Sequence, residues 1–224
     1  MQSYAGRNRR SYDGVRISRS GKPMRTSIWL VRHGQTELNK ARRYQSISDG
    51  PLTPFGLRQA SALAERLRRL PFKVAVVSPS QRAQVTAETI LADRIAPIVA
   101  DQRWAETNHG RWEGLTYGEV RERYPHEAVQ RFADALHGKP TGGESLAEVA
   151  QRVGEGWRAL LQQYPGGRVL VVTHATPIQL VLCALSEMSP ALHWRWRVDL
   201  GSVTSIDVYG GGPIIRMVNE VPHL

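Results

Sequence analysis

The sequence predicts an α/β fold of three layers (α/β/α), in which a mostly parallel central sheet lies between two layers of helices. Short apolar runs that are typical of strands alternate along the chain with segments of helical periodicity, as in parallel α/β proteins. The runs are continuously apolar, as expected of strands that are buried on both faces. No internal repeat is present in the sequence.

The length and composition fit one folded domain. The chain has 224 residues, 41% of them hydrophobic and 22% charged, which is the balance of a globular protein with its own core. Cys183 is the single cysteine, so the sequence offers no intramolecular disulfide and no cysteine-based metal site. A lone cysteine is typical of a reducing compartment, and we expect a cytoplasmic protein.

Half of the net charge of +10 lies in the first 24 residues. Residues 1–24 contain six basic side chains and one aspartate, and they lack the apolar core of a secretion signal. We predict a basic, flexible tail over residues 1–24 and a folded domain over residues 25–224. A tail that contacts nucleic acid is the alternative, which we do not favour. No apolar run reaches the roughly 18 residues of a spanning helix, so we expect no membrane partner.

The first half of the domain is predicted to contain two strands, each followed by a helix. Residues 27–31 and 73–77 are apolar runs typical of buried strands. Thr53-Pro54 supplies an N-cap and a first helical residue, so a helix starts there, and Pro71 stops it. The second helix is expected over residues 81–91.

The middle of the chain is predicted to hold a short strand over residues 98–100 and two capped helices. Residues 116–119 and 145–148 each match the capping-box pattern, in which a hydroxyl residue is followed three positions later by a glutamate. Helices are therefore expected to start near residues 116 and 145, with residues 141–143 in the loop between them.

The last part of the chain contains the clearest strand, over residues 168–173. A helix over residues 176–185 follows, because Thr-Pro opens that segment. Residues 203–209 and 214–218 are predicted to form a final hairpin around the glycines at 210–212.

Two predicted strands end in histidines, and a third strand leads to an arginine. His33 and His174 each come directly after a strand, and Arg82 follows the strand at 73–77. Ligands of open α/β sheets bind beyond the carboxyl ends of the strands, so we expect these groups to converge. Arg32 beside His33 suits phosphate chemistry, because a guanidinium can hold two phosphate oxygens and a neutral imidazole nitrogen is a competent nucleophile.

Five segments occur in an order that resembles the histidine phosphatase superfamily, also called the phosphoglycerate mutase-like family. The first, Leu30–Thr36, fits the opening pattern L-x-R-H-G-x-T. The others resemble further motifs of the family in sequence order: residues 49–56, 78–87, 106–114 and 142–145. Trp112–Thr116 resembles the branch of the α-ribazole phosphatases and broad-specificity phosphatases.

This resemblance implies a role for each catalytic candidate. His33 would be the nucleophile that forms a phosphohistidine. Arg32 and Arg82 would bind the phosphoryl oxygens, with a protonated His174 as a further donor. Glu106 would protonate the leaving oxygen and then activate water, and Glu113 is the competing carboxylate, which could instead support the loop. The sequence leaves open how the acid obtains its proton.

Four more residues are predicted to contact substrate. By resemblance, Asn39 matches a polar position that faces the phosphate, and Gln45 lies in the loop before Ser46. Ala175 follows the second histidine, where glycine is frequent in the family. His109 lies in the loop of the candidate acid, with a solvated loop histidine as its alternative role.

The resemblance predicts a phosphomonoesterase that acts through a phosphohistidine on a small phosphorylated metabolite. It implies neither a metal nor another cofactor. A phosphoglycerate mutase activity is the first alternative, and a catalytically silent module with a nucleic-acid-contacting tail is the second. Formation of a homodimer stays open.

Overall fold

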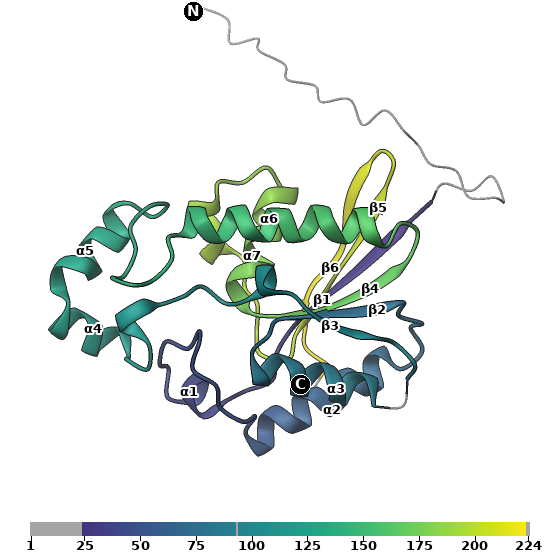
Figure 1. Cartoon of the computed structure of the whole chain (residues 1–224), viewed down its shortest axis with the longest axis horizontal. Coiled ribbons are helices and arrows are strands. Elements are labelled where there is room, and N and C mark those ends of the chain that lie inside the picture. The colour runs from purple at the N-terminus through teal and green to yellow at the C-terminus, as the bar shows by residue number, and fades with distance from the viewer. Residues whose placement is uncertain (1–23, 93, 223–224) are drawn as a thin grey trace, which may run out of the picture.

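The computed structural model describes residues 24–92 and 94–222, in which one central sheet carries helices on both faces (Figure 1). The predicted tail lies outside these ranges, apart from Met24. The strand order is β3-β2-β4-β1-β5-β6. The first four strands in this order are parallel, and β5 and β6 add an antiparallel edge. The predicted fold class is therefore confirmed. The strands are β1 (Thr26–Arg32), β2 (Val74–Val77), β3 (Ile98–Ala100), β4 (Arg168–Thr173), β5 (Val203–Tyr209) and β6 (Gly212–Glu220).

Two long helices cover each face of the sheet (Figure 1). On one face lie α2 (Pro54–Leu67) and α3 (Gln81–Leu91), and on the other lie α6 (Leu146–Gln163) and α7 (Ala175–Leu185). Shorter elements include α1 (Glu37–Lys40), α4 (Tyr117–Arg123) and α5 (Pro125–Ala133), of which α4 and α5 project to one side. Three 3₁₀ helices span Gln102–Trp104, Gly110–Trp112 and Pro190–Arg195.

Alternating side chains of the central strands form the two halves of the core. In β4, Val169 and Val171 belong to the cluster under α6 and α7, whereas Leu170 and Val172 belong to the cluster against α2 and α3. Successive strand residues point to opposite faces, so a strand buried on both faces must be apolar throughout. This requirement explains why the strands were recognisable as continuous apolar runs.

Three predicted helix starts are confirmed at atomic detail. The Thr53 hydroxyl accepts the Gly56 N–H at 3.0 Å, with Pro54 as the first helical residue. Both predicted capping boxes are present, at Thr116 before α4 and at Ser145 before α6. Side-chain caps satisfy backbone donors that a helix leaves unpaired, which is why such short patterns mark helix starts.

Two helices were not predicted, and the start of a third differs from the prediction. Helices α1 and α5 are the two that were not predicted. The N-cap of α5, Tyr124, makes no side-chain capping bond and thus leaves no capping pattern in the sequence. Helix α7 begins at Ala175 and not at Thr176, with His174 as its N-cap. Pro177 therefore lies in the first turn, where its missing N–H has no helical partner to lose. In the described residues, no helix is long and apolar enough to cross a membrane.

Two glycines bring the loop after β1 against the start of α2. A Cβ atom at Gly56 would lie 2.2 Å from the Gln35 carbonyl oxygen, and one at Gly34 would lie 2.5 Å from the Gly56 carbonyl oxygen. The same contact is held by the Thr53 N–H, which donates to the Gln35 carbonyl at 2.8 Å. Backbone therefore packs directly on backbone beside His33.

We expect Gly56→Ala to lower the free energy of unfolding by about 1–3 kcal/mol, because the added methyl overlaps rigid backbone. The matched control is Gly154→Ala in α6, where the nearest atom to the new Cβ is the mobile Arg158 Nη1 at 3.6 Å. That change should stabilise the protein by roughly 0.5–1 kcal/mol through helix propensity. Urea unfolding of both variants measures the difference, and equal stabilities would contradict the packing described.

Candidate active site

Three neighbouring parallel strands bring the predicted phosphate-binding groups together. His33 follows β1, His174 follows β4, and Arg82 lies in the first turn of α3, after β2. The two imidazole rings stand 4.9 Å apart between centroids at 64° to each other. Arg82 Nη2 lies 3.4 Å from His174 Nδ1. The convergence expected from the strand ends is therefore present in the structure.

The His33 ring is oriented by its own loop. Its Nδ1 lies 2.7 Å from the Gly34 carbonyl oxygen, and only 3% of the residue is exposed. A carbonyl can only accept, so Nδ1 must carry the ring proton. The unprotonated lone pair is then at Nε2, which is the form that a nucleophile requires. The Gly34 N–H donates to Thr86 Oγ1 at 3.2 Å and ties this loop to α3.

The Arg82 guanidinium is buried and is bound by the loop at residues 46–48, which precedes the motif at residues 49–56. Its Nη2 donates to the Ser46 carbonyl at 2.9 Å and its Nη1 to the Ser48 carbonyl at 3.2 Å. Only 1% of the residue is exposed, and its Nε has no hydrogen-bond partner among the described residues. Burial lowers the pKa of Arg82, although Glu106, Asp49 and Glu113 raise it. An anion would complete the hydrogen bonding of this cation.

Arg32, the last residue of β1, is similarly arranged. Its Nη1 donates to the Val198 carbonyl at 2.7 Å, whereas its Nε is buried without a partner in the described part of the chain. Burial lowers the pKa of Arg32, and the charges of Glu106 and Asp199 oppose this effect. Both guanidinium groups thus feel the Glu106 carboxylate, and each has a buried Nε without a hydrogen-bond partner among the described residues.

The two histidines are neutral with these neighbours. Burial is the largest cause that lowers the pKa of each well below its usual value. The positive charges of Arg82 and Arg32 lower both pKa values further, and for His174 the His33 ring contributes as well. The protonated His174 expected from the sequence is therefore not favoured until an anion binds. The cationic charge of the site comes from the two arginines.

His174 takes the opposite tautomer to His33. Arginine can only donate, so the Arg82 contact places the lone pair of His174 at Nδ1. The proton is then at Nε2, which lies 2.8 Å from Ser78 Oγ and 3.4 Å from Ser80 Oγ. Ser78 was not predicted as a site residue, although its place directly after β2 is the same signal that identified the histidines.

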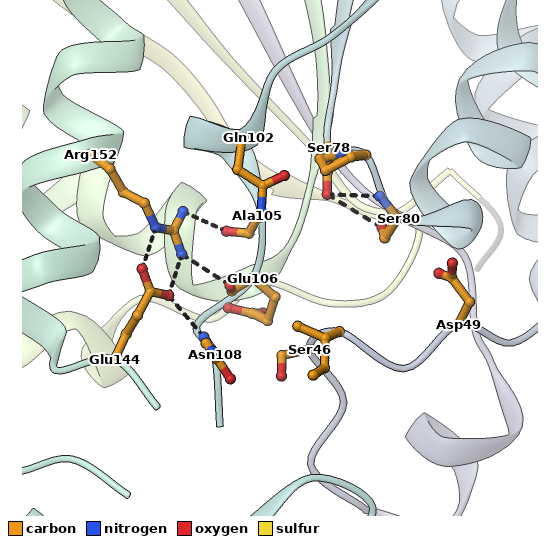
Figure 2. Close-up of a pocket in the computed structure, with 12 residues that line it drawn as sticks. Ser46, Asp49, Ser78, Ser80, Gln102, Ala105, Glu106, Asn108, Glu144 and Arg152 are labelled. Atoms are coloured by element: carbon orange, nitrogen blue, oxygen red, sulfur yellow. Dashed lines mark hydrogen bonds and ion pairs between the residues drawn. The ribbon is translucent and has the colours of Figure 1, made fainter. Parts of the chain in front are cut away.

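Glu106 lines a cavity of about 360 Å³ together with Ser78 and Ser80 (Figure 2). Its Oε1 accepts the Thr107 N–H at 2.8 Å. Its backbone carbonyl accepts from Arg152 Nη2 at 2.9 Å. The predicted acid therefore lies at the same cavity as the serines that contact His174.

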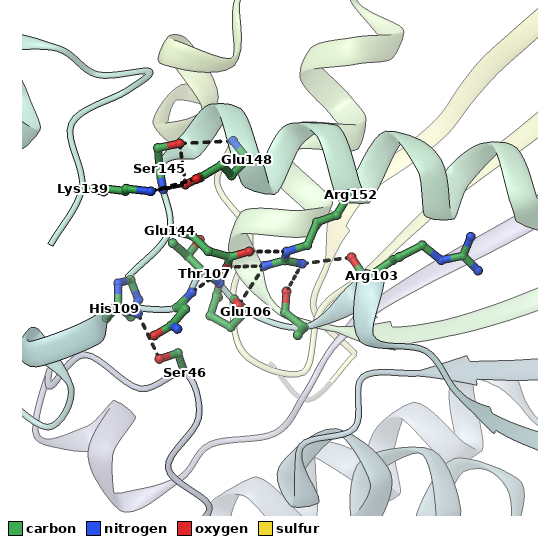
Figure 3. A network of polar contacts seen from close by, with 12 residues as sticks. Ser46, Arg103, Glu106, Thr107, His109, Lys139, Glu144, Ser145, Glu148 and Arg152 are labelled. Atoms are coloured by element: carbon green, nitrogen blue, oxygen red, sulfur yellow. Dashed lines mark hydrogen bonds and ion pairs between the residues drawn. The ribbon is translucent and has the colours of Figure 1, made fainter. Parts of the chain in front are cut away.

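Arg152, on α6, organises the segment around Glu106 (Figure 3). Besides the Glu106 carbonyl, its guanidinium binds the carbonyls of Arg103 and Ala105 at 3.0 and 2.8 Å. It also pairs with Glu144, which accepts the Asn108 N–H at 2.9 Å. Sequence reasoning missed Arg152, because contacts with backbone carbonyls leave no residue-type pattern.

Glu113 supports the Arg82 loop and is not among the residues that line the cavity of Glu106. Its carboxylate accepts the N–H groups of Ser46 and Ser48 at 2.8 and 3.1 Å, and it also accepts both hydroxyls. Burial raises the pKa of Glu113, but these hydrogen bonds outweigh it and the pKa is lowered. These contacts agree with the other predicted role of Glu113, which was to support the loop.

The four residues predicted to touch substrate have these positions. Asn39 Oδ1 accepts the Thr36 N–H at 3.1 Å in the capping box of α1. Gln45 accepts from the Thr36 hydroxyl at 2.6 Å and donates to the Ser48 carbonyl at 3.3 Å. Ala175 opens α7 and packs on the core. The His109 N–H donates to Ser46 Oγ at 3.1 Å. Contact of these residues with substrate stays a prediction.

Among the residues that the structure describes, no group of three or more His, Cys, Asp or Glu side chains could hold a metal ion. The charged residues that line the cavity are Asp49, Glu106, Glu144 and Arg152, and the Glu106 carboxylate also acts on the nearby Arg32 and Arg82. Two arginines near one carboxylic acid fit a phosphate group.

Comparison with known families agrees with this geometry. A model described as the histidine phosphatase superfamily (branch 1) matches residues 28–221. The chain belongs to this superfamily. Its solved members include the α-ribazole phosphatase of Shigella flexneri, which is 30% identical with a TM-score of 0.81 over 87% of this chain and 96% of that one. The resemblance to the phosphoglycerate mutase-like fold is thereby confirmed.

The curated relatives in the superfamily have different activities. Phosphoserine phosphatase 1 of Hydrogenobacter thermophilus is 33% identical over 87% of this chain and 92% of its own length. A phosphoglycerate mutase of Gloeobacter violaceus is 36% identical over 72% of this chain and 76% of its own length. A bifunctional protein of Mycobacterium tuberculosis is 38% identical over 89% of this chain, but the chain spans only 55% of its length.

The histidine arrangement predicts opposite tautomers with low pKa values. Long-range ¹H–¹⁵N NMR at pH 6.5 should show His33 protonated at Nδ1 and His174 at Nε2, both rings neutral. Burial and the arginines lower the pKa of both histidines in the folded protein below the value of roughly 6.5 in an unfolded chain. As the pH decreases, the two histidines are therefore protonated in the unfolded state before they are protonated in the folded state. The free energy of unfolding should therefore fall as the pH decreases below about 6.5. A pKa of 6.5 or above for either ring would contradict this arrangement.

Proposed function

We propose that the chain is a phosphatase that hydrolyses monoesters through a phosphohistidine on His33. The observation that carries this proposal is the arrangement of His33. Its lone pair is at Nε2, and its ring contacts that of His174, which in turn contacts Arg82. Arg32 and Arg82 would donate to the phosphoryl oxygens, and both lie close enough to Glu106 to feel its charge. Phosphoryl transfer needs mainly such positioning and charge stabilisation, and neither requires a metal.

In the first step, His33 Nε2 attacks phosphorus while the bond to the leaving oxygen breaks. Glu106, as the carboxylic acid, gives its proton to that oxygen, so the alcohol leaves neutral. The phosphoryl group is then bonded to Nε2, and its oxygens are held by the two arginines. The incoming dianion raises the proton affinity of His174, which can then donate to it.

In the second step, the Glu106 carboxylate takes a proton from water, and the water oxygen attacks phosphorus. The P–N bond breaks, inorganic phosphate leaves, and His33 and the acid return to their starting forms. Arg152 has a positioning role in both steps, because it holds the carbonyls that flank the acid. We place the reaction in the cytoplasm, on a small phosphorylated metabolite, in the manner of the α-ribazole and broad-specificity phosphatases.

Phosphoglycerate mutase activity is the second candidate, and the relative from Gloeobacter violaceus favours it. A mutase would return the phosphoryl group from His33 to a sugar acid before water reaches it. Interconversion of 2- and 3-phosphoglycerate that depends on 2,3-bisphosphoglycerate would support this candidate. Release of inorganic phosphate without interconversion would support the phosphatase.

The proposal predicts that the protein hydrolyses p-nitrophenyl phosphate in the presence of EDTA and that His33→Ala abolishes turnover. The loss follows because the variant has no nitrogen to accept the phosphoryl group. The matched control is His126→Ala, which removes an exposed histidine of α5 and should leave the rate unchanged. Release of p-nitrophenol measures both. Undiminished turnover in His33→Ala would show that the nucleophile is elsewhere.

A further inference from the structure

A second cavity, of about 610 Å³, lies beside the one that contains Glu106. Half of its lining residues are aromatic or basic, with Arg131 as the arginine among them: Tyr44, His109, Trp112, Arg131, His193 and Trp194. The rings of Tyr44 and His109 are 4.7 Å apart, and those of Tyr44 and Trp112 are 5.6 Å apart. Trp194 is 66% exposed. The cavity therefore offers flat apolar surfaces.

Residues 106–109 form part of the wall between the two cavities. Glu106 and Asn108 line the first cavity, whereas Thr107 and His109 line the second. Glu144 lines both, so the cavities share a wall (Figure 3 shows Glu144 between the Glu106 segment and α6). Thr176, two residues after His174, also lines the second cavity. The second cavity is therefore adjacent to the carboxyl group that would protonate the leaving oxygen.

Arg131 is a half-buried cation in this second cavity, and it has no acidic partner within the described part of the chain. Its Nη1 donates to the Ala135 carbonyl at 3.0 Å. No carboxylate of the described residues forms an ion pair with it. Glu144, the carboxylate of the cavity, is paired with Arg152, and Asp134 acts on Arg131 only at longer range.

The surroundings of Arg131 favour the binding of an anionic ligand group over that of a cationic or apolar one. Burial lowers its pKa, so the charge is incompletely solvated in the protein alone. The other titratable groups of the cavity are Tyr44, His109, His193 and Glu144. Burial lowers the pKa of both histidines, so neither adds positive charge at neutral pH. A bound carboxylate or phosphate would supply the missing partner through charge-assisted hydrogen bonds.

We propose that the second cavity binds the alcohol portion of the substrate and that Arg131 selects alcohols that carry a second anionic group. This inference rests on the proposed phosphatase function and specifies its substrate class. The aromatic walls accommodate a flat or apolar spacer between the ester oxygen and the second anion. Arg131 is then a specificity residue, remote from the transferred phosphoryl group.

The test compares substrates that differ in one charge. The pair is 4-carboxybenzyl phosphate and 4-carbamoylbenzyl phosphate, which have nearly the same shape, and 4-phosphonobenzyl phosphate adds a second kind of anion. The measured quantity is kcat/KM for the charged substrate divided by kcat/KM for the neutral one. This ratio cancels losses that affect both substrates equally, including partial unfolding. The thermal midpoint of each variant reports its folding.

Arg131→Gln should lower the ratio by about 10- to 100-fold, since it removes a hydrogen bond to a charged group. Arg131→Lys should retain most of the ratio. The matched control is Arg123→Gln, an exposed arginine of α4 that does not line the cavity, and it should leave the ratio unchanged. A loss of preference for either anion, carboxylate or phosphonate, supports the inference.

An unchanged ratio for both anions in Arg131→Gln would overturn the inference, even if the wild-type protein hydrolyses all three esters. Absence of turnover of every ester and of p-nitrophenyl phosphate by the wild-type protein would overturn the proposed function itself, and the inference with it. The two failures are thus distinguishable in one set of measurements.

Discussion

The parallel pairing of β1 with β4 positions the reactive groups of this protein. Arg32 pairs with Thr173 in the ladder, and the His33 N–H donates to the Thr173 carbonyl at 3.1 Å. Both strands therefore end at the same level, and the residues that follow them meet. Because β2 lies on the other side of β4, Arg82 reaches the same point. The sheet register thus determines the spacing of two imidazoles and a guanidinium far more rigidly than loops could.

Burial of these groups determines their chemistry. Desolvation keeps both histidines neutral, which gives His33 its nucleophilic lone pair, and leaves two arginines with unfilled donors. Buried cations are costly without hydrogen-bonded partners, so the surrounding loops are organised to hold them. Ser46 and Ser48 bind Arg82 through their carbonyls, and Glu113 holds both serines. The proposed phosphate site is therefore held in place by the protein's own hydrogen bonds.

Much of this account could be predicted from the sequence, because strand ends and helix caps leave residue-type patterns. The two histidines and Arg82 follow continuous apolar runs, and Thr53 precedes a proline, so their places were recognisable. Other features leave no such pattern. Arg152 acts on backbone carbonyls, and helix α5 has no capping side chain. Arg131 looks like any helical arginine in the sequence, and its lack of an acidic partner appears only in three dimensions.

Identification of the phosphorylated residue tests the central claim most directly. The protein is mixed with a phosphomonoester, quenched in alkali within one turnover, digested and mapped by mass spectrometry. The account predicts a phosphoryl group on His33 that is stable in alkali and lost in acid. With p-nitrophenyl phosphate, whose leaving group needs no acid, it accumulates when Glu106→Gln slows attack by water. A phosphoryl group on His174, or turnover without any phosphorylated protein in both the wild type and Glu106→Gln, would contradict it.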